Sequence, residues 1–297
     1  MTRWIPWTAL GALLALAAGL PLEAQGPGVS LEPERVVWID GGHFRRGSRP
    51  EDLRSALTLC TRAYRGRSDR CSEELWALEL PQRDIYVSRF GIDRTEVTNA
   101  AYARCVAAGA CSPARVSLAD DRVGQPQMPV SGVTHRQART FCEFAGGRLP
   151  TESEWERAAR GPDGRPFPWG HQWNDRLANH GAAGSQPDPI DGHRYAAPVG
   201  SYPGGASPRG VLDMSGNVWE WTADRGGPDG HDWEAGPAVD PTGATTGGER
   251  MVRGGSWRST PDALRVTTRI PVPEGTTAPD LGFRCAYERP RGAPRRR

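Results

Sequence analysis

The sequence predicts a single α+β domain that is rich in loops and low in regular secondary structure. Its 297 residues include 37 glycines and 27 prolines spread along the chain, and these residues favour turns and interrupt helices and strands. Helix-end signals occur only between residues 98 and 161, and short strand-like runs lie on both sides of them. No internal repeat or linker divides the chain, so we expect one domain over residues 33–289.

The first 24 residues have the organisation of a secretory signal peptide. Arg3 precedes an apolar run over about residues 9–20, and "LEA" precedes Gln25. We expect cleavage after Ala24, a linker over 25–32, and an exported protein that is periplasmic or secreted. The run is shorter than the roughly 20 residues that span a bilayer, and no cysteine follows it, so we expect no membrane anchor.

Two stretches near the start of the expected domain look like pairs of strands. "RVVWIDGGHFRRGS" (35–48) reads as a strand, a Gly-Gly turn and a second short strand, and "RDIYVSRFGIDRTEVTN" (83–99) is again strand-like. Residues 48–80, between them, are polar and without clear periodicity. We expect this segment to be an irregular surface insertion held by a disulfide.

Three helices are expected next, each opened by a threonine cap and closed by glycine. The caps are Thr98, Thr134 and Thr151, and the glycines that end the helices are Gly109, Gly146 and Gly161. Thr151 and Glu154 also have the spacing of a capping box. Beyond residue 162 helical periodicity is almost absent, so we expect loops and short strands.

The six cysteines are even in number, and in an exported protein this favours disulfides. Six cysteines allow 15 pairings. Proximity in the sequence favours Cys60 with Cys71 and Cys105 with Cys111, which leaves Cys142 and Cys285. None forms a C-x-x-C motif, so zinc and redox motifs fit poorly.

The net charge of +2 predicts no affinity for nucleic acid. The basic tail over 290–297 is expected to be a disordered, solvated end.

Four segments together carry a resemblance to a known family. They are "IDRTEVTNAAY" (92–102), "GGRLPTESEWERAARG" (146–161), "LDMSGNVWEWTAD" (212–224) and "MVRGGSW…LGFRCA" (251–286). In this order they resemble the formylglycine-generating enzyme family, the sulfatase-modifying-factor domain. The resemblance implies a fold related to the C-type lectin fold. It also implies kinship with pyoverdine-maturation proteins and the C-terminal domains of ergothioneine sulfoxide synthases.

Active members of that family oxidise a sulfatase cysteine to formylglycine with copper held between two cysteines. Residues 253–257 match the family pattern before that pair, but Ser259 and Leu264 stand at the two cysteine positions. Cu(I) selects thiolate ligands, so we expect neither copper nor formylglycine-generating activity. Cys142 and Cys285 stand where the family forms its bridge.

The resemblance also implies two structural calcium sites. The matching positions are Asp213, Gly216, Val218 and Glu220 in one loop, and Asn179, His180, Asp191 and His193 in the other. Calcium prefers carboxylate and carbonyl oxygens, which such loops supply. For the first loop the alternative is a turn whose acids cap backbone amides.

A pocket is expected at Trp219, Ser256, Trp257, Arg258 and Ser259. Its catalytic residues, if any, stay unknown, because a serine without a nearby base is a weak nucleophile. We expect a binding or accessory module for a peptide, protein or small-molecule ligand. One alternative is an oxidoreductase that uses a different metal or cofactor in the same pocket. The other is an enzyme that oxidises cysteine although the copper-binding cysteine pair is absent.

Overall fold

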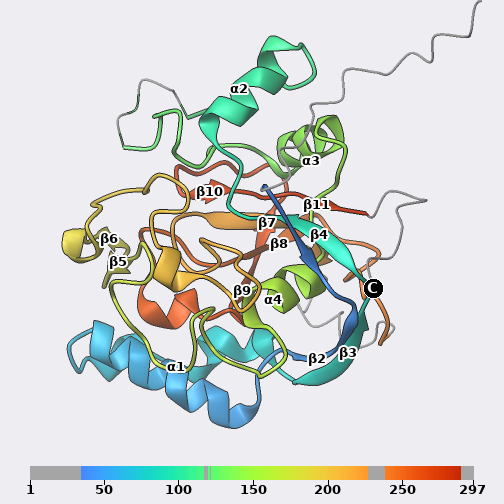
Figure 1. Cartoon of the computed structure of the whole chain (residues 1–297). Coiled ribbons are helices and arrows are strands. Elements are labelled where there is room, and N and C mark those ends of the chain that lie inside the picture. Colours follow the sequence, from blue (N-terminus) through green and yellow to red (C-terminus); the bar gives the residue numbers. More distant parts are fainter. Residues whose placement is uncertain (1–34, 117–119, 121, 227–237, 289–297) are drawn as a thin grey trace, which may run out of the picture.

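The computed structural model describes residues 35–116, 120, 122–226 and 238–288, and it confirms a single α+β domain (Figure 1). The expected signal peptide (1–24), linker (25–32) and basic tail (290–297) lie outside the described residues. Within the described part of the chain, no helix is both long and apolar enough to cross a bilayer.

The central element is a four-stranded sheet in the order β10-β7-β8-β9. Its strands are β7 (Trp219–Gly226), β8 (Glu249–Arg253), β9 (Arg269–Pro273) and β10 (Leu281–Gly282). β8 runs antiparallel to β7 and β9, whereas β10 runs parallel to β7. Figure 1 shows β7 and β8 at the centre of the molecule. The segments that follow these strands are therefore anchored at one end to the central sheet.

Smaller sheets complete the strand structure. A three-stranded sheet has the order β1-β4-β11, and two pairs are formed by β2 with β3 and by β5 with β6. The bounds are β1 (Val36–Ile39), β2 (Gly42–Arg46), β3 (Arg83–Val87), β4 (Phe90–Asp93), β5 (Gly181–Ala182), β6 (Gln186–Pro187) and β11 (Ala286–Tyr287). The Gly-Gly turn after β1 therefore joins strands of two different sheets.

The three capped helices are confirmed. They are α2 (Asn99–Ala107), α3 (His135–Phe144) and α4 (Glu152–Arg160). Each threonine side chain accepts a hydrogen bond from the third helical N–H, and α3 and α4 have complete capping boxes. After α4 the helical segments of the described residues are short 3-10 turns, namely η3 (Pro189–Asp191), η4 (Pro203–Gly205) and η6 (Pro261–Leu264).

The expectation of an irregular insertion over 48–80 is wrong. The segment contains α1 (Pro50–Ala63), followed by η1 (Ser68–Arg70) and η2 (Glu73–Glu79). Proline favours the first helical turn, and Arg49 and Asp52 close a capping box. Leu53, Ala56 and Cys60 form the buried face. Only three buried residues in fourteen repeat at helical spacing, which is why the periodicity is weak in the sequence.

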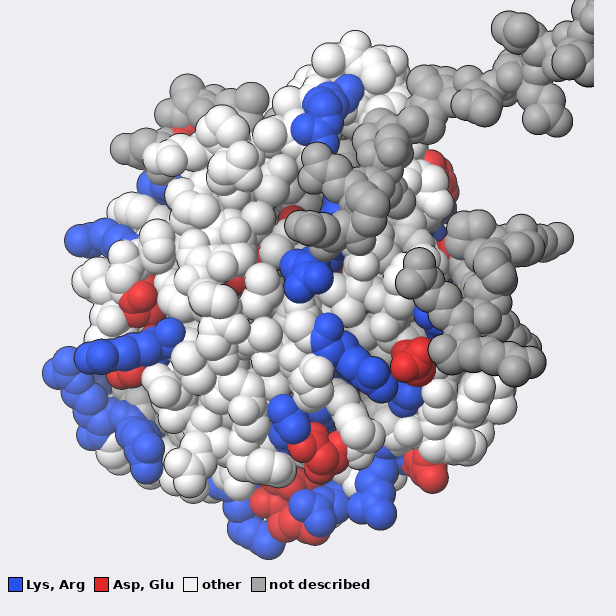
Figure 2. Space-filling model, viewed as in Figure 1, with Lys and Arg blue, Asp and Glu red and all other residues white. Residues whose placement is uncertain are grey.

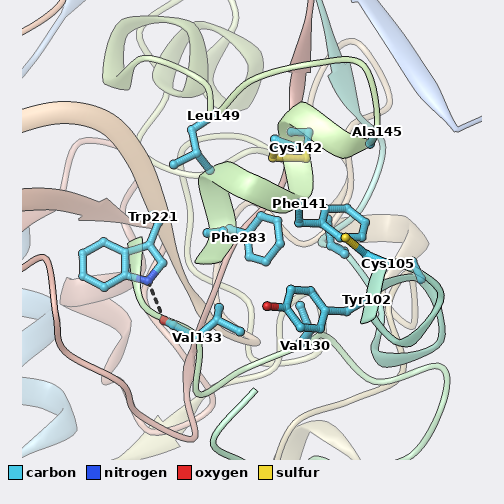
Figure 3. Close-up of a cluster of buried hydrophobic side chains, with 14 of the residues drawn as sticks. Tyr102, Cys105, Val130, Val133, Phe141, Cys142, Ala145, Leu149, Trp221 and Phe283 are labelled. Carbon is cyan, nitrogen blue, oxygen red and sulfur yellow. Dashed lines mark hydrogen bonds between the residues drawn. A yellow bond between two sulfur atoms is a disulfide. The ribbon is translucent and has the colours of Figure 1, made fainter. Parts of the chain in front are cut away.

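All three disulfides form with the favoured pairing: Cys60–Cys71, Cys105–Cys111 and Cys142–Cys285. The third joins α3 to the segment before β11 inside the main hydrophobic cluster (Figure 3). Around it, the rings of Tyr102, Phe141 and Phe283 pack against one another. The indole N–H of Trp221 donates to the Val133 carbonyl at 3.0 Å, which satisfies its polar atom inside the core.

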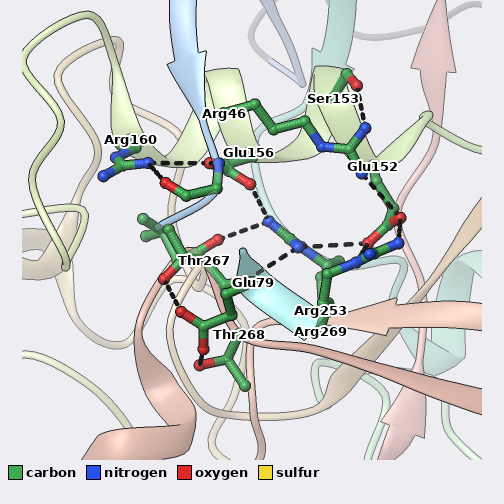
Figure 4. A network of polar contacts seen from close by, with 12 residues as sticks. Arg46, Glu79, Glu152, Ser153, Glu156, Arg160, Arg253, Thr267, Thr268 and Arg269 are labelled. Carbon is green, nitrogen blue, oxygen red and sulfur yellow. Dashed lines mark hydrogen bonds and ion pairs between the residues drawn. The ribbon is translucent and has the colours of Figure 1, made fainter. Parts of the chain in front are cut away.

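A buried network of charges attaches α4 to the strands (Figure 4). The carboxylate of Glu152 is fully buried and pairs with three guanidinium groups, those of Arg46 at 3.0 Å, Arg253 at 3.3 Å and Arg269 at 2.5 Å. These cations hold the pKa of Glu152 at about 2 despite the opposing effect of burial. The network fixes β8, and with it the start of the segment that carries the expected pocket.

Candidate functional site

The candidate pocket begins where the chain leaves β8 through two glycines. Gly254 and Gly255 have φ angles of +94° and +75°, a region that side chains strongly disfavour. A Cβ on Gly255 would also lie 3.0 Å from the Ala263 carbonyl oxygen. Only glycine therefore allows the chain to reverse here and bring Ser256 beside η6.

Ser256 is fully buried, and its hydroxyl group is the centre of a small hydrogen-bond network. It donates to Asp280 Oδ2 at 2.9 Å and accepts the Arg258 N–H at 3.2 Å. The Ser259 hydroxyl accepts the Ser256 N–H at 3.0 Å. The two serines are therefore engaged in holding the turn, and no histidine or lysine contacts either hydroxyl among the described side chains.

Asp280 also connects this turn to the first residue of β7. Its backbone carbonyl accepts the Trp219 N–H at 2.8 Å, while its carboxylate binds Ser256. The structure thus brings Trp219, Ser256, Arg258 and Ser259 into one neighbourhood. Sequence reasoning missed Asp280, which directly precedes the "LGFRCA" segment.

Trp257 faces the interior rather than the solvent. It is 5% exposed and lies in a cluster with Met128, Ala196 and Val218, with its ring 5.4 Å from that of Tyr195. The Arg258 guanidinium lies over the Trp257 ring at 5.6 Å. Of the residues expected in the pocket, Trp219, Arg258 and Ser259 are half-buried. Trp219 packs against the main hydrophobic cluster, and the buried Trp257 ring supports Arg258.

In one of the two expected calcium loops the fold brings Asn179 beside Asp191, and calcium there stays a prediction. Asp191 accepts the backbone N–H of His180 at 2.7 Å and that of His193 at 2.8 Å. Asn179 Nδ2 donates to Asp191 Oδ2 at 3.2 Å, and Asn179 Oδ1 is buried without a partner. Burial raises the pKa of Asp191. A buried amide oxygen without a donor, beside a carboxylate, fits the oxygen ligands of calcium.

In the other expected calcium loop, over residues 213–220, the acidic side chains have other partners. Both carboxylate oxygens of Glu220 bind Arg284, at 2.7 and 2.8 Å, and Trp155 Nε1 donates to one of them at 2.9 Å. Asp213 Oδ2 accepts the Gly200 N–H at 2.7 Å, which is the amide-capping role of the alternative interpretation. Calcium at Asp213, Gly216, Val218 and Glu220 stays a prediction, and the contacts of Glu220 weigh against that residue as a ligand.

Three buried carboxylates share one arginine in this region, and sequence reasoning missed two of the four residues. Glu96 and Arg284 join Asp213 and Glu220. Burial raises the pKa of Asp213 to about 6, and burial together with Asp213 and Glu220 raises that of Glu96. Glu96 follows β4 and Arg284 lies between β10 and β11, and the available signal in the sequence is a single charge beside apolar residues.

Side-chain ligands alone do not form a metal centre in the described residues, where no three His, Cys, Asp or Glu side chains are arranged to hold an ion together. Calcium in these loops would thus depend on backbone carbonyls as well.

Comparison with known proteins decides the family. Residues 25–289 match the model of the FGE-sulfatase family, described as the sulfatase-modifying factor enzyme 1-like domain. The chain belongs to this family. It is 38% identical over 184 residues to the formylglycine-generating enzyme of Streptomyces coelicolor, covering 57% of this chain and 55% of that protein.

Relatives in the family differ in what their names say about activity. The chain is 36% identical over 168 residues to a mouse protein named inactive C-alpha-formylglycine-generating enzyme 2, covering 54% of this chain and 49% of that one. The chain thus aligns with about half the length of these curated relatives. The structure of PvdO from Pseudomonas aeruginosa aligns with a TM-score of 0.64 at 23% identity, over 85% of this chain and 94% of that one, which supports the fold.

The fold gives neither family cysteine position a sulfur atom. Ser259 is held in the turn described above, and Leu264, on η6, is fully buried. The Leu264 side chain packs closely against two glycines. A Cβ added to Gly255 would lie 3.0 Å from Leu264, and a Cβ added to Gly216 would lie 3.2 Å from it. All six cysteines of the chain are in disulfides, so no thiol elsewhere replaces the pair.

Proposed function

We propose that this protein is an exported binding or accessory member of the FGE-sulfatase family that does not oxidise cysteine to formylglycine. One observation carries the proposal: a hydroxyl group and a hydrocarbon side chain occupy the two copper-ligand positions, Ser259 and Leu264, while all six cysteines are in disulfides. Cu(I) needs soft sulfur ligands, and this site offers none.

The ligand in this proposal contacts Trp219, Arg258 and Ser259. Arg258 supplies a guanidinium group, which recognises carboxylates and other anions through paired hydrogen bonds. The guanidinium group already lies over the Trp257 ring and makes one contact with the Ser185 carbonyl, at 3.4 Å. This partial fixation lowers the entropy that binding must remove.

Two further observations support the proposal. The mouse relative carries the word inactive in its name, so the family contains members described as lacking the oxidase activity. Three disulfides are typical of proteins that fold in oxidising compartments outside the cytoplasm, and this agrees with the signal peptide expected over residues 1–24. Calcium, held at Asn179 and Asp191, is proposed as a structural ion.

The test combines metal analysis with an activity assay on the exported chain purified without added metal. Calcium without copper or iron supports the proposal, whereas stoichiometric copper or iron supports an oxidoreductase. The purified chain is then incubated with Cu(I) and a cysteine-containing sulfatase peptide, with the Streptomyces coelicolor enzyme as positive control. We expect no aldehyde by mass spectrometry. Aldehyde formation that rises with added Cu(I) would overturn the proposal.

A matched pair of variants tests the reason for inactivity. Ser259→Cys with Leu264→Cys restores both sulfur positions, and Ser259→Cys alone restores one. We expect the double variant to compete for Cu(I) against a chromophoric chelator, and the single variant and the unchanged chain to fail. Equal copper uptake by all three proteins would show that sulfur at these positions is not the deciding feature.

A further inference from the structure

A large cavity lies apart from the Ser256 turn, between α1 and the segment that follows α4. Its volume is about 720 Å³, which is within the usual range for pockets that bind small molecules. Its walls include Ser55, Thr58 and Arg62 of α1, and, after α4, Pro162, Asp163, Gly164, Pro166 and Phe167. None of Trp219, Ser256, Trp257, Arg258 and Ser259 lines it.

The α1 wall of this cavity is held in place by covalent and polar contacts. The Cys60–Cys71 disulfide ties the end of α1 to the following segment. Leu53, Ala56 and Cys60 pack with Trp76 in a hydrophobic cluster of their own. The cavity is thus a property of this inserted segment and the core together.

Arginines dominate the charge of the lining. Three of its five arginines are neutralised by acidic partners: the pairs are Arg49–Asp52, Arg160–Glu156 and Arg265–Glu79. The remaining acidic residue of the lining, Asp163, is paired with Arg165 at 2.5 Å. These pairs leave two arginines, Arg45 and Arg62, to set the charge of the cavity.

Arg45 and Arg62 are both exposed. Among the described residues, neither side chain has a hydrogen bond or an ion pair with an acidic group. They come from different elements, β2 and α1, and both line the same cavity. Figure 2 shows blue side chains gathered at the lower left, where Figure 1 places α1. The cavity therefore carries an excess of positive charge.

A buried donor without an acceptor points the same way. Arg160 lines the cavity and is 3% exposed. Two of its nitrogens donate to the carbonyls of Gly47 and Gly164, at 2.7 and 2.9 Å, but its Nε has no partner. An unsatisfied buried donor is costly, so this third guanidinium group of the lining, although paired with Glu156, keeps one donor without an acceptor.

One wall is aromatic. Phe167 and Trp173 line the cavity, with ring centroids 5.4 Å apart. Phe167 also stacks on Trp169 at 5.2 Å with an interplanar angle of 5°, and this fixes its orientation. A site with free guanidinium groups on one side and ring faces on the other matches a ligand that has a charged end and an apolar or planar end.

We propose that this cavity binds a small organic anion. Its carboxylate or phosphate group pairs with Arg45 and Arg62, and its apolar or aromatic part packs against Trp173. This binding site is separate from the pocket at Ser256, so the two proposals stand or fall independently.

Calorimetric titration of the full chain tests the proposal with three small probes. Phenyl phosphate combines an aromatic ring with a phosphate group, and benzoate combines the ring with a carboxylate group. Phenol has the ring without an anionic group. We expect saturable binding of at least one of the anions, weakened by added salt, and no binding of phenol. Phenol binding as tightly as both anions, or the absence of saturable binding for all three, would overturn the proposal.

Variants locate the site. Arg45→Gln with Arg62→Gln removes both free cations, and both residues are exposed, so we expect the fold to survive, as checked by circular dichroism. Arg54→Gln is the matched control, because Arg54 is an exposed α1 residue outside the lining. We expect the double variant to bind the anion about tenfold or more weakly, and we expect the control to leave the affinity unchanged. An equal loss of affinity in both variants would show that the anion is attracted by the overall positive charge, and it would refute a defined site.

Discussion

The Cys142–Cys285 disulfide allows a quantitative test of how the fold is held together. The two cysteines are 143 residues apart in sequence, whereas Cys105 and Cys111 are 6 apart. A crosslink restricts the unfolded chain more when the loop that it closes is longer. The chain-entropy relation gives about 5 kcal/mol for the long loop and about 2 kcal/mol for the short one.

The two disulfides form a matched pair. All four cysteines lie in the same hydrophobic cluster, and none is more than 7% exposed. Replacing each pair by alanines therefore removes similar packing, and the difference in the free energy of unfolding isolates the loop. We expect Cys142→Ala with Cys285→Ala to lose about 3 kcal/mol more than Cys105→Ala with Cys111→Ala.

Urea unfolding followed by circular dichroism measures both losses, with sucrose in every sample so that the weaker variant stays folded. Equal losses in the two variants would refute the reasoning. Stability would then come from native contacts at the sulfur atoms rather than from restriction of the unfolded chain.

Three further predictions concern buried charges and calcium. Arg284→Met leaves the Glu220 carboxylate without its cation and is expected to cost about 3–5 kcal/mol in urea unfolding; a cost below about 1 kcal/mol contradicts the pairing. Burial and the Glu152 carboxylate raise the pKa of Asp224 to about 7. Because this folded pKa lies above the unfolded value of about 3.9, the Asp224 contribution to stability declines as pH rises from about 4 to 7. Asp224→Asn should flatten that decline in unfolding curves measured across this range, and an unchanged slope would contradict it. Removing calcium with a chelator should lower the thermal midpoint of the unchanged chain but not that of an Asn179→Ala variant; equal responses would exclude this loop as the site.

Local signals in the sequence predicted the three central helices, because each signal acts within one turn. A threonine that caps the third N–H and a glycine that ends the helix need no distant partner. The same reasoning failed for α1, where the capping pair is Arg49 and Asp52 rather than a threonine or serine. The buried face of α1 is recognisable only in the folded chain, where Trp76 and the Cys60–Cys71 disulfide pack against it.

The candidate site divides in the same way. Ser259 and Leu264 could be identified from the sequence, because the family pattern places the two cysteines at fixed distances along the chain from Arg253. Asp280 escaped notice because it reaches Ser256 across 24 residues, and nothing in the local sequence specifies that contact. Trp257 was expected in the pocket, but its burial shows that it supports Arg258 instead.

The sequence by itself determined the family, the ends of α2, α3 and α4, the favoured cysteine pairing and the loss of both copper-ligand sulfurs, since each depends on residue identities and short spacings. Only the tertiary structure decided which charges are neutralised. Glu220 pairs with Arg284 across 64 residues and Glu152 pairs with Arg269 across 117. The same folding leaves Arg45 and Arg62 lining one cavity without acidic partners. Electrostatic pairing acts through space over a few ångströms, so the order of residues along the chain does not reveal it.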